Sequence, residues 1–447
     1  MHEATQLGDG WQELMGAFAT VFTRPGWVRF VQWVTGMVLC WEEHTLPQIV
    51  TALGLASRWR ALEHFAEYGA WDRPAVERAT LRLIARERPA RWGGDHPVAL
   101  DDTKRHRTSA KVWGTCTFQE ASARSPNRAE TVRAHNWVVL GDLVPGTPWM
   151  SLPHAARLYC RQSQLPTGET FHTKTAWAVE WLRQADAESS APIVGVCDGA
   201  DAVATVVEPG GHPGPGQRRI ESLTRLRVDA RLYQPVTSRT RPKGRRPKGG
   251  DRLAAPQHHV YWSTSWRTGR AWVYGRRRAF RSKPLRCRWS VSGPPLPVHV
   301  FVVEVPGYRE PWFLVTTALD LSATKVVAVF AARVRQEDGF RDHPQRLGME
   351  ACRAWTKEPV LRTFQVQMVA LTLLRLLPCR LDQTRGVGSW WHKPEWYAQK
   401  RHASLRDLCR LFWRHRTVCS QLLVALEETE KPCHGPALHG NGVSRAA

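Results

Sequence analysis

The stretch Pro97-Val98-Ala99-Leu100-Asp101-Asp102-Thr103 is a short apolar run that leads directly into two adjacent acids. A second run, Pro192-Ile193-Val194-Gly195-Val196, leads into Asp198 in the same way. Short apolar runs of this kind predict buried strands, and the stretch 174–184 between them has helical spacing. Strands that alternate with a helix indicate a mixed α/β fold, in which one sheet delivers an acid from each of two strands.

The regions on either side of these strands differ in pattern. Apolar residues recur at helical spacing between positions 10 and about 90, which predicts an amphipathic helical bundle. This bundle fits DNA binding and dimerisation equally well. Further strands are expected at 298–305 and 313–317, and further helices at 359–377 and 403–427.

The charge of the chain is strongly positive and unevenly distributed. Its 63 Lys and Arg against 40 Asp and Glu give a net charge of +23. The segment 218–289 holds 21 Lys and Arg and three acids, so it carries +18 of that charge. Like charges at this density repel one another unless a polyanion lies nearby, which indicates contact with nucleic acid. A membrane partner is not expected, because the apolar stretch 27–41 is too short to span a bilayer.

Within this basic segment, two features favour DNA binding. The run 241–250 is rich in Pro, Gly and basic residues, so it is expected to be extended. Aromatic residues interleaved with arginines follow it, and their alternation around 260–262 and 271–274 predicts a β-hairpin with its turn near 267–270. Arginines suit phosphates, and exposed aromatic rings suit unpaired bases. The candidate DNA-binding residues are Arg241, Lys243, Arg245, Arg246, Lys248, Trp262, Trp266, Arg267, Trp272, Arg276, Arg277 and Arg278.

A third acid lies further along the chain, in a stretch with helical spacing. Arg333, Glu337 and Arg341 share one helix face there, which fits a metal-binding glutamate between phosphate-binding arginines. Taken by itself, this spacing is more often a salt-bridge ladder. With Asp101 and Asp198, Glu337 completes three carboxylates, the ligand type that suits Mg²⁺. Two such ions stabilise the attacking and leaving oxygens of phosphoryl transfer. An aspartate after a strand is also a common turn or cap residue.

The ten cysteines include no Cys-x-x-Cys pair, so neither a zinc ribbon nor a thioredoxin-type site is indicated. We interpret them as buried thiols of an intracellular protein.

The chain resembles the insertion-sequence DDE transposases that carry the signature Tyr-x2-Arg-x3-Glu-x6-Lys. In that spacing it has Phe330, Arg333, Glu337 and Pro344, so the signature tyrosine and lysine are replaced. The resemblance covers roughly residues 95 to 380. The other matching segments, in the family's order, are Leu100-Asp-Asp-Thr103, His135-Asn-Trp-Val-Val-Leu140, Val196-Cys-Asp-Gly-Ala200, the Arg-Pro-Lys-Gly loop from Arg241, Thr316–Ser322 and Gln345-Arg-Leu-Gly348.

The resemblance implies a fold and a set of site residues. It implies an RNase H-like catalytic core, interrupted between the second aspartate and the glutamate by a β-rich insertion. Asp101, Asp198 and Glu337 would be the catalytic acids and the ligands of two Mg²⁺ ions, which Mn²⁺ could replace. The family's Asp-x-Thr pattern favours Asp101, with Asp102 as the alternative. In the insertion, Trp262, Trp266 or Trp272 would accept a flipped base.

The implied activity is cut-and-paste transposition in the bacterial cytoplasm, in association with the nucleoid. The enzyme would cleave at the ends of the element and join the freed 3′-hydroxyls to target DNA. Its partners would be double-stranded DNA, as terminal inverted repeats and target, and a second copy in a homodimer. Because Phe330 lacks the signature hydroxyl and Pro344 lacks the signature charge, two alternatives stay open: an RNase H-like nuclease without strand transfer, and a decayed or domesticated transposase that only binds DNA.

These expectations divide the chain into five segments. They are a helical N-terminal domain for DNA binding or dimerisation (1–95), the first part of the core (96–205), the basic Trp- and Arg-rich β insertion (206–295), the second part of the core (296–380), and a C-terminal helical region with a loose tail (381–447).

Overall fold

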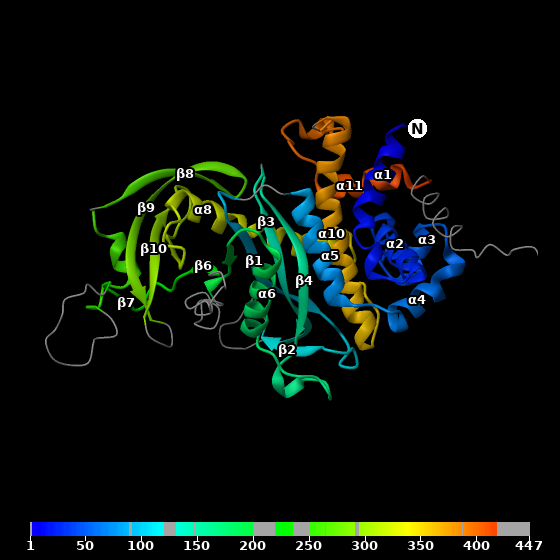
Figure 1. Ribbon diagram of the computed structural model, residues 1–447, viewed down its shortest axis with the longest axis horizontal. Coiled ribbons are helices and arrows are strands. Elements are labelled where there is room, and N and C mark those ends of the chain that lie inside the picture. Colours follow the sequence, from blue (N-terminus) through cyan, green and yellow to red (C-terminus); the bar gives the residue numbers. More distant parts are fainter. Residues whose placement is uncertain are drawn as a thin grey trace, which may run out of the picture.

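The computed structural model describes residues 2–88, 92–119, 131–146, 148–199, 220–235, 250–263, 265–290, 295–386 and 388–417. Figure 1 shows a sheet flanked by helices, with a helical bundle at one end of the molecule and a strongly curved set of strands at the other. The predicted mixed α/β fold with helices from both ends of the chain is confirmed.

The described strands form one sheet of eleven strands. Its main path is β2-β3-β1-β5-β6-β11-β10-β9-β7, with β4 paired to β3 and β8 paired to β9. β5 lies parallel to β1 and to β6, and the other neighbours are antiparallel. The strands are β1 His96–His106, β2 Cys116–Gln119, β3 Thr131–Val144, β4 Met150–Tyr159, β5 Ile193–Val196, β6 Glu221–Arg225, β7 Leu232–Tyr233, β8 Arg267–Val273, β9 Arg276–Trp289, β10 Leu296–Glu304 and β11 Trp312–Thr316.

Helices from the two ends of the sequence pack into one bundle. The N-terminal helices are α1 His2–Gly16, α2 Arg24–Leu39, α3 Leu46–Ala52, α4 Trp59–Tyr68 and α5 Arg73–Glu87. All of these except α3, which packs on α2 and α4, pack against α10 Lys357–Arg385, with α11 Leu405–Arg414 beside it. Short 3-10 turns lie at Ala19–Val21, Ala56–Arg58, Gln162–Gln164, Pro256–Val260 (η6) and Glu395–Tyr397. Within the described residues, α10 alone is long and apolar enough to cross a membrane, and its apolar window is 94% buried in the fold. It is therefore the core helix of the bundle.

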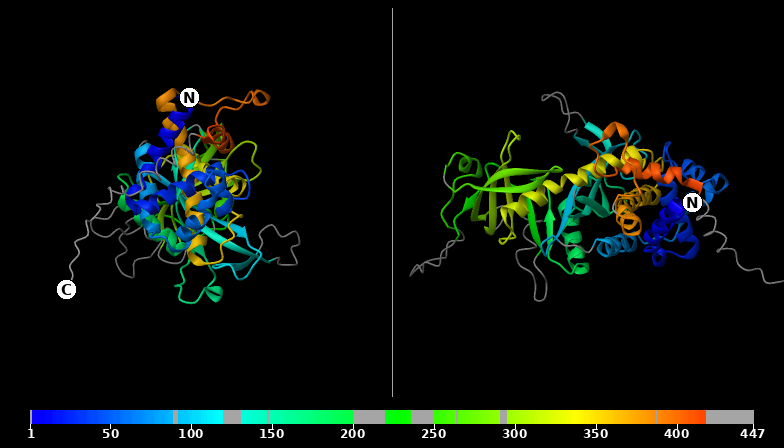
Figure 2. Two further views of the ribbon diagram at one scale, coloured as in Figure 1. Left: turned by 90° about the vertical axis from the view of Figure 1, so that its right-hand side faces the viewer. Right: turned by 90° about the horizontal axis from the view of Figure 1, so that it is seen from above.

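Helices cover both faces of the central strands, and the alternation along β1 assigns each residue to a face. Val98 and Leu100 pack with Trp181 of α6 Lys174–Glu188. Ala99 packs on the other face, in the cluster that contains Phe330 of α8 Ala323–Ala332. α9 Val334–Arg346 follows α8 almost without interruption, and Figure 2 shows the pair running from the β-rich end toward the bundle.

Three local expectations are wrong. β1 does not end at the acids but runs on to His106, because β3 pairs with it as far as Ala134. The β8–β9 hairpin turns at Tyr274 and Gly275, whereas 267–270 lies within β8. Val260 ends the 3-10 turn η6 instead of lying in a strand.

The expectation that the cysteines are free thiols is wrong for one pair. Cys116 in β2 and Cys160 after β4 form a disulfide, while Cys40, Cys197 and Cys287 are among the free, buried cysteines.

Candidate active site

Two aspartates come level on neighbouring parallel strands. β1 and β5 pair in a register that places Ala99 beside Val196. Asp101 lies two residues after Ala99, and Asp198 lies two residues after Val196. Both acids are therefore at the same level of the sheet. Asp198 directly follows β5 and is exposed; its Oδ1 accepts the Gly199 amide at 2.7 Å, and its backbone carbonyl accepts the Thr224 hydroxyl of β6 at 2.9 Å.

The adjacent acids Asp101 and Asp102 lie on opposite faces of the sheet. Asp102 pairs with Lys174 of α6, Nζ to Oδ2 at 2.7 Å. Asp101 shares its face with Ala99 and pairs with Arg333, Nη1 to Oδ2 at 2.5 Å. The alternation of a strand therefore separates the two candidates, and Asp101 is the one that faces α8 and α9.

Arg333 joins the first aspartate to the glutamate. It stands between α8 and α9, and its second nitrogen, Nη2, lies 2.9 Å from Oε1 of Glu337. The arginine side chain is 14% exposed and that of Glu337 is 50% exposed. Two acids that are 236 residues apart in the sequence are thus held on one guanidinium, with the glutamate at the solvent side.

The electrostatics of this cluster are perturbed. Burial raises the pKa of Asp101 from its ordinary value to about 7, although the positive charge of Arg333 acts against that shift. Burial alone would lower the pKa of Arg333, but the negative charges of Asp101, Glu337 and Asp198 together raise it. The three candidate acids therefore act on the same guanidinium. A cluster of titratable groups that perturb one another in this way is typical of functional sites.

Helix α9 is anchored to the sheet by contacts that the sequence did not suggest. Gln336 is buried; its Nε2 donates to the Val139 carbonyl of β3 at 3.1 Å, and its Oε1 accepts from the Ser151 hydroxyl of β4. Arg105 of β1 donates to the Phe340 carbonyl. These contacts fix the rotation of α9, so that Glu337 points toward the Asp101 face.

A family model described as "DDE superfamily endonuclease" matches residues 17–283 of the chain. This chain belongs to that family. The matched part of this endonuclease contains Asp101 and Asp198 and ends before Glu337, so the glutamate rests on the geometry described above. No protein with curated annotation matches the sequence.

DDE endonucleases of this kind generally depend on divalent cations, and the carboxylates here fit that need. Within the described residues, no three His, Cys, Asp or Glu side chains gather closely enough to cage one ion. Mg²⁺, however, needs only one or two carboxylates, because waters and substrate phosphates complete its shell. Asp101 with Asp198 and Asp101 with Glu337 offer two such pairs. Between Asp101 and Glu337 lies the positive charge of Arg333, which pairs with both carboxylates.

The other signature positions of the endonuclease have structural roles. The ring of Phe330 is buried and lies 5.9 Å from that of Trp312. Pro344 lies inside α9, which ends shortly after it at Arg346. Arg341, a candidate phosphate ligand, pairs with Asp338 at 3.0 Å, and its side chain is 63% exposed.

The predicted DNA-binding residues divide between the two ends of the β8–β9 hairpin. Trp272 and Arg277 pair across the strands, exposed and close to the turn. Trp262 and Trp266 lie toward the opposite end, where both contact Lys283. Arg267 and Arg276 are exposed, and Arg278 lies over the Tyr308 ring. Arg241, Lys243, Arg245, Arg246 and Lys248 fall outside the described residues.

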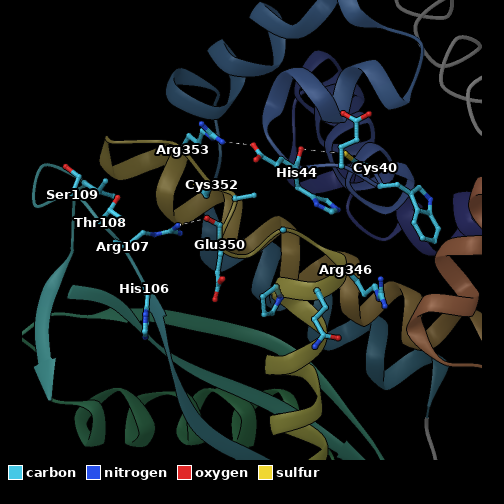
Figure 3. Close-up of a pocket in the computed structure, with 18 of the residues that line it drawn as sticks. Cys40, His44, His106, Arg107, Thr108, Ser109, Arg346, Glu350, Cys352 and Arg353 are labelled. Atoms are coloured by element: carbon cyan, nitrogen blue, oxygen red, sulfur yellow. Dashed lines mark hydrogen bonds and ion pairs between the residues drawn. The ribbon is translucent and has the colours of Figure 1, made fainter. Parts of the chain in front are cut away.

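A cavity of about 750 Å³ lies away from the acids, at the far end of β1. Figure 3 shows its labelled lining, in which Arg107 contacts Glu350 and Arg353 reaches toward the loop of His44. Its lining includes three arginines and three glutamates, and the Arg353 guanidinium is paired with Glu43 at 2.6 Å. The cavity therefore has no clear preference for an anion, and the candidate active site remains the acid cluster.

Proposed function

We propose that this DDE endonuclease is a DNA transposase that cleaves at the ends of an insertion sequence and joins them to target DNA. The observation that carries the proposal is the acid cluster: Asp101 and Asp198 level on parallel strands, and Glu337 joined to Asp101 through Arg333. DNA as the substrate follows from the family. The excision of an insertion sequence and its joining to target DNA go beyond what the family shows and are the proposal.

In this proposal Asp101, Asp198 and Glu337 hold two Mg²⁺ ions. Such ions supply charge stabilisation for the attacking and leaving oxygens of phosphoryl transfer. Arg333 orients Asp101 and Glu337 through its two ion pairs and neutralises part of their charge. The side chain of Asp102 lies on the other face and holds α6 through Lys174. Its backbone amide donates to Oδ1 of Asp101 at 2.9 Å.

The remaining segments bind and arrange the DNA. The basic β-rich segment 206–295 binds the element ends, which is supported by the exposed Arg270, Trp272 and Arg277 on one face of the hairpin. The helical segment 1–95 contributes DNA binding or dimerisation, and two ends brought together imply a homodimer. The core segments 96–205 and 296–380 supply the acids, and 381–447 completes the bundle.

The test is cleavage of a duplex that carries the inverted repeat flanking the gene, with Mg²⁺ or Mn²⁺ present. We expect the wild type to cut at the repeat end and to join a pre-cleaved end to a plasmid. Asp198→Ala should abolish both reactions, because it removes a carboxylate that no neighbour replaces. Asp102→Asn is the matched control: it changes an acid one residue from Asp101 on the other face, and cleavage should persist.

Other results would select the alternatives. Cleavage without any joined product would identify a nuclease that lacks strand transfer. Binding of the repeat without cleavage by the wild type, under either metal, would identify a DNA-binding protein that has lost catalysis and would reject the transposase.

A further inference from the structure

The turn between β8 and β9 holds a tyrosine in an unfavourable backbone conformation. Val273 pairs with Arg276, so Tyr274 and Gly275 are the two central residues of the turn. Their φ angles are +48° and +80°. Turns of this type favour Asn-Gly, because a bulky side chain is strained at positive φ. Strained residues of this kind concentrate at functional sites, so the position of Tyr274 indicates a function beyond the turn.

Neighbouring rings hold Tyr274 in place and bury only part of it. Its ring centroid lies 5.6 Å from that of Tyr308 and 5.9 Å from that of Trp312. Trp312 in turn contacts Phe330, one helical turn before Arg333 on α8. Tyr274 nevertheless remains 41% exposed. A ring supported on one side and open on the other is ready to contact a ligand.

The turn lies beside the acid cluster. A Cβ atom built on Gly275 would be 3.4 Å from the guanidinium of Arg335, at the start of α9. The charges of Arg333 and Glu337 act on the Tyr274 phenol, and so does that of Arg225 at the end of β6. Burial raises the pKa of this phenol above its usual value, so it is a neutral hydrogen-bond donor at pH 7.

We propose that Tyr274 contacts the substrate: its hydroxyl donates a hydrogen bond to a phosphate oxygen of the DNA strand that enters the acid cluster. Phosphates accept hydrogen bonds but offer no donor, and Glu337 repels them, so a neutral donor beside the glutamate is suited to hold the strand. The charges of Arg225 and Arg333, which also act on the phenol, add attraction for a phosphate. The inference rests on the proposed function for the presence of a DNA strand at the acids.

Three variants separate the effect of the Tyr274 hydroxyl from the effect of the residue on the conformation of the turn. Tyr274→Phe removes only the hydroxyl and keeps the ring contacts. Tyr274→Asn removes the side chain and places a residue that tolerates positive φ in the turn. Tyr308→Phe is the control, because it removes a hydroxyl from the same ring cluster. The measurements are Mn²⁺-dependent nicking of a supercoiled plasmid, binding of a short fluorescein-labelled duplex in EDTA, and the melting temperature.

We expect Tyr274→Phe to lower the nicking rate about tenfold or more, the range for one hydrogen bond to a charged group, at an unchanged melting temperature. Tyr274→Asn should nick at least as poorly and yet melt at a higher temperature. Tyr308→Phe should resemble the wild type. Wild-type nicking by Tyr274→Phe would overturn the proposal.

The binding measurement separates this proposal from the proposed function. If the wild type does not nick DNA, the transposase proposal fails. In that case a duplex affinity about tenfold lower for Tyr274→Phe than for Tyr308→Phe still supports the contact, and equal affinities overturn it.

Discussion

At the scale of single residues, the decisive contacts are those of Asp101. The sequence placed two acids side by side and predicted that only one would face the site. Side-chain alternation along a strand places adjacent residues on opposite faces, but it does not tell which face Arg333 lies on. The sequence therefore could not choose between the two acids by alternation. The ion pairs of Asp101 with Arg333 and of Asp102 with Lys174 distinguish them. The place of Asp198 just after a buried strand was predictable from the apolar run 192–196. Its level with Asp101 depends on the register of β1 with β5, which the two runs alone do not fix.

The raised pKa of Asp101 predicts how the stability of the folded protein depends on pH. The folded protein holds the Asp101 proton more tightly than the unfolded chain does, since burial raises that pKa from 3.8 to about 7. Between these two values the unfolded state releases the proton first, so stability falls as the pH rises through that window. In EDTA, Asp101→Asn should therefore melt above the wild type, by a margin that grows from about pH 4 to about pH 7 and then levels off.

Asp102→Asn serves as the control, because it breaks the ion pair with Lys174 and relieves no buried charge. It should not raise the melting temperature anywhere in this range. A margin for Asp101→Asn that shrinks with rising pH would contradict the explanation.

At the scale of elements, the apolar runs and helical periods located β1, β5, β10, β11, α6 and α10 and the two helical ends, but not β2, β4, β6, β7 or the hairpin turn. The turn was expected near 267–270, a range that includes Gly269. This glycine instead lies within β8, where a Cβ atom would be 2.5 Å from the Phe280 ring, so the glycine allows close packing. Tyr274 did not resemble a turn residue because its side chain opposes the conformation it adopts. The extension of β1 through polar residues depends on pairing with β3, which a single segment does not reveal.

One buried lysine ties the tryptophan-bearing loop to the hairpin. Lys283 of β9 is 2% exposed; its ammonium donates to the carbonyls of His259 at 2.9 Å and Trp262 at 2.6 Å. Lys283→Met keeps the apolar stem but leaves both carbonyls without this donor. We expect a loss of about 1–3 kcal/mol in the free energy of unfolding, measured in urea.

The conservative variant Lys283→Arg should retain part of this stability, since it keeps a charged donor. Equal stability of Lys283→Met and the wild type would show that water satisfies the two carbonyls.

At the scale of the whole molecule, the basic segment and the helical bundle lie at opposite ends. The basic segment forms much of the curved end of the sheet, while the helical bundle lies at the other end (Figure 1). The charge of this segment was evident from composition. Both sets of helices in the bundle were expected from the sequence, but their packing was not. Helix α10 packs against α1, α2, α4 and α5, which lie about 270 residues or more earlier in the sequence. No local sequence pattern encodes a contact over that separation.

This polarity predicts how DNA binding depends on salt. Each phosphate neutralised contributes roughly −0.9 to the slope of log affinity against log salt. Arg270→Ala and Arg277→Ala, on the exposed face of the hairpin, should each reduce the magnitude of that slope by about 1. The measurement is titration of a labelled duplex at several salt concentrations.

Arg183→Ala is the matched control, because Arg183 is exposed on α6, which covers the face opposite Arg333. Its slope should equal that of the wild type. Equal slopes for all three variants would place the DNA elsewhere on the molecule.

The position of α10 at the centre of the bundle also has a consequence during synthesis. The N-terminal helices leave the ribosome early, but the helix that completes their core begins at Lys357. At a synthesis rate of roughly 5–20 residues per second, the apolar faces of α1 and α2 remain without α10 for a time on the order of tens of seconds. A nascent chain, or one truncated before α10, therefore presents an unfinished core to chaperones and proteases.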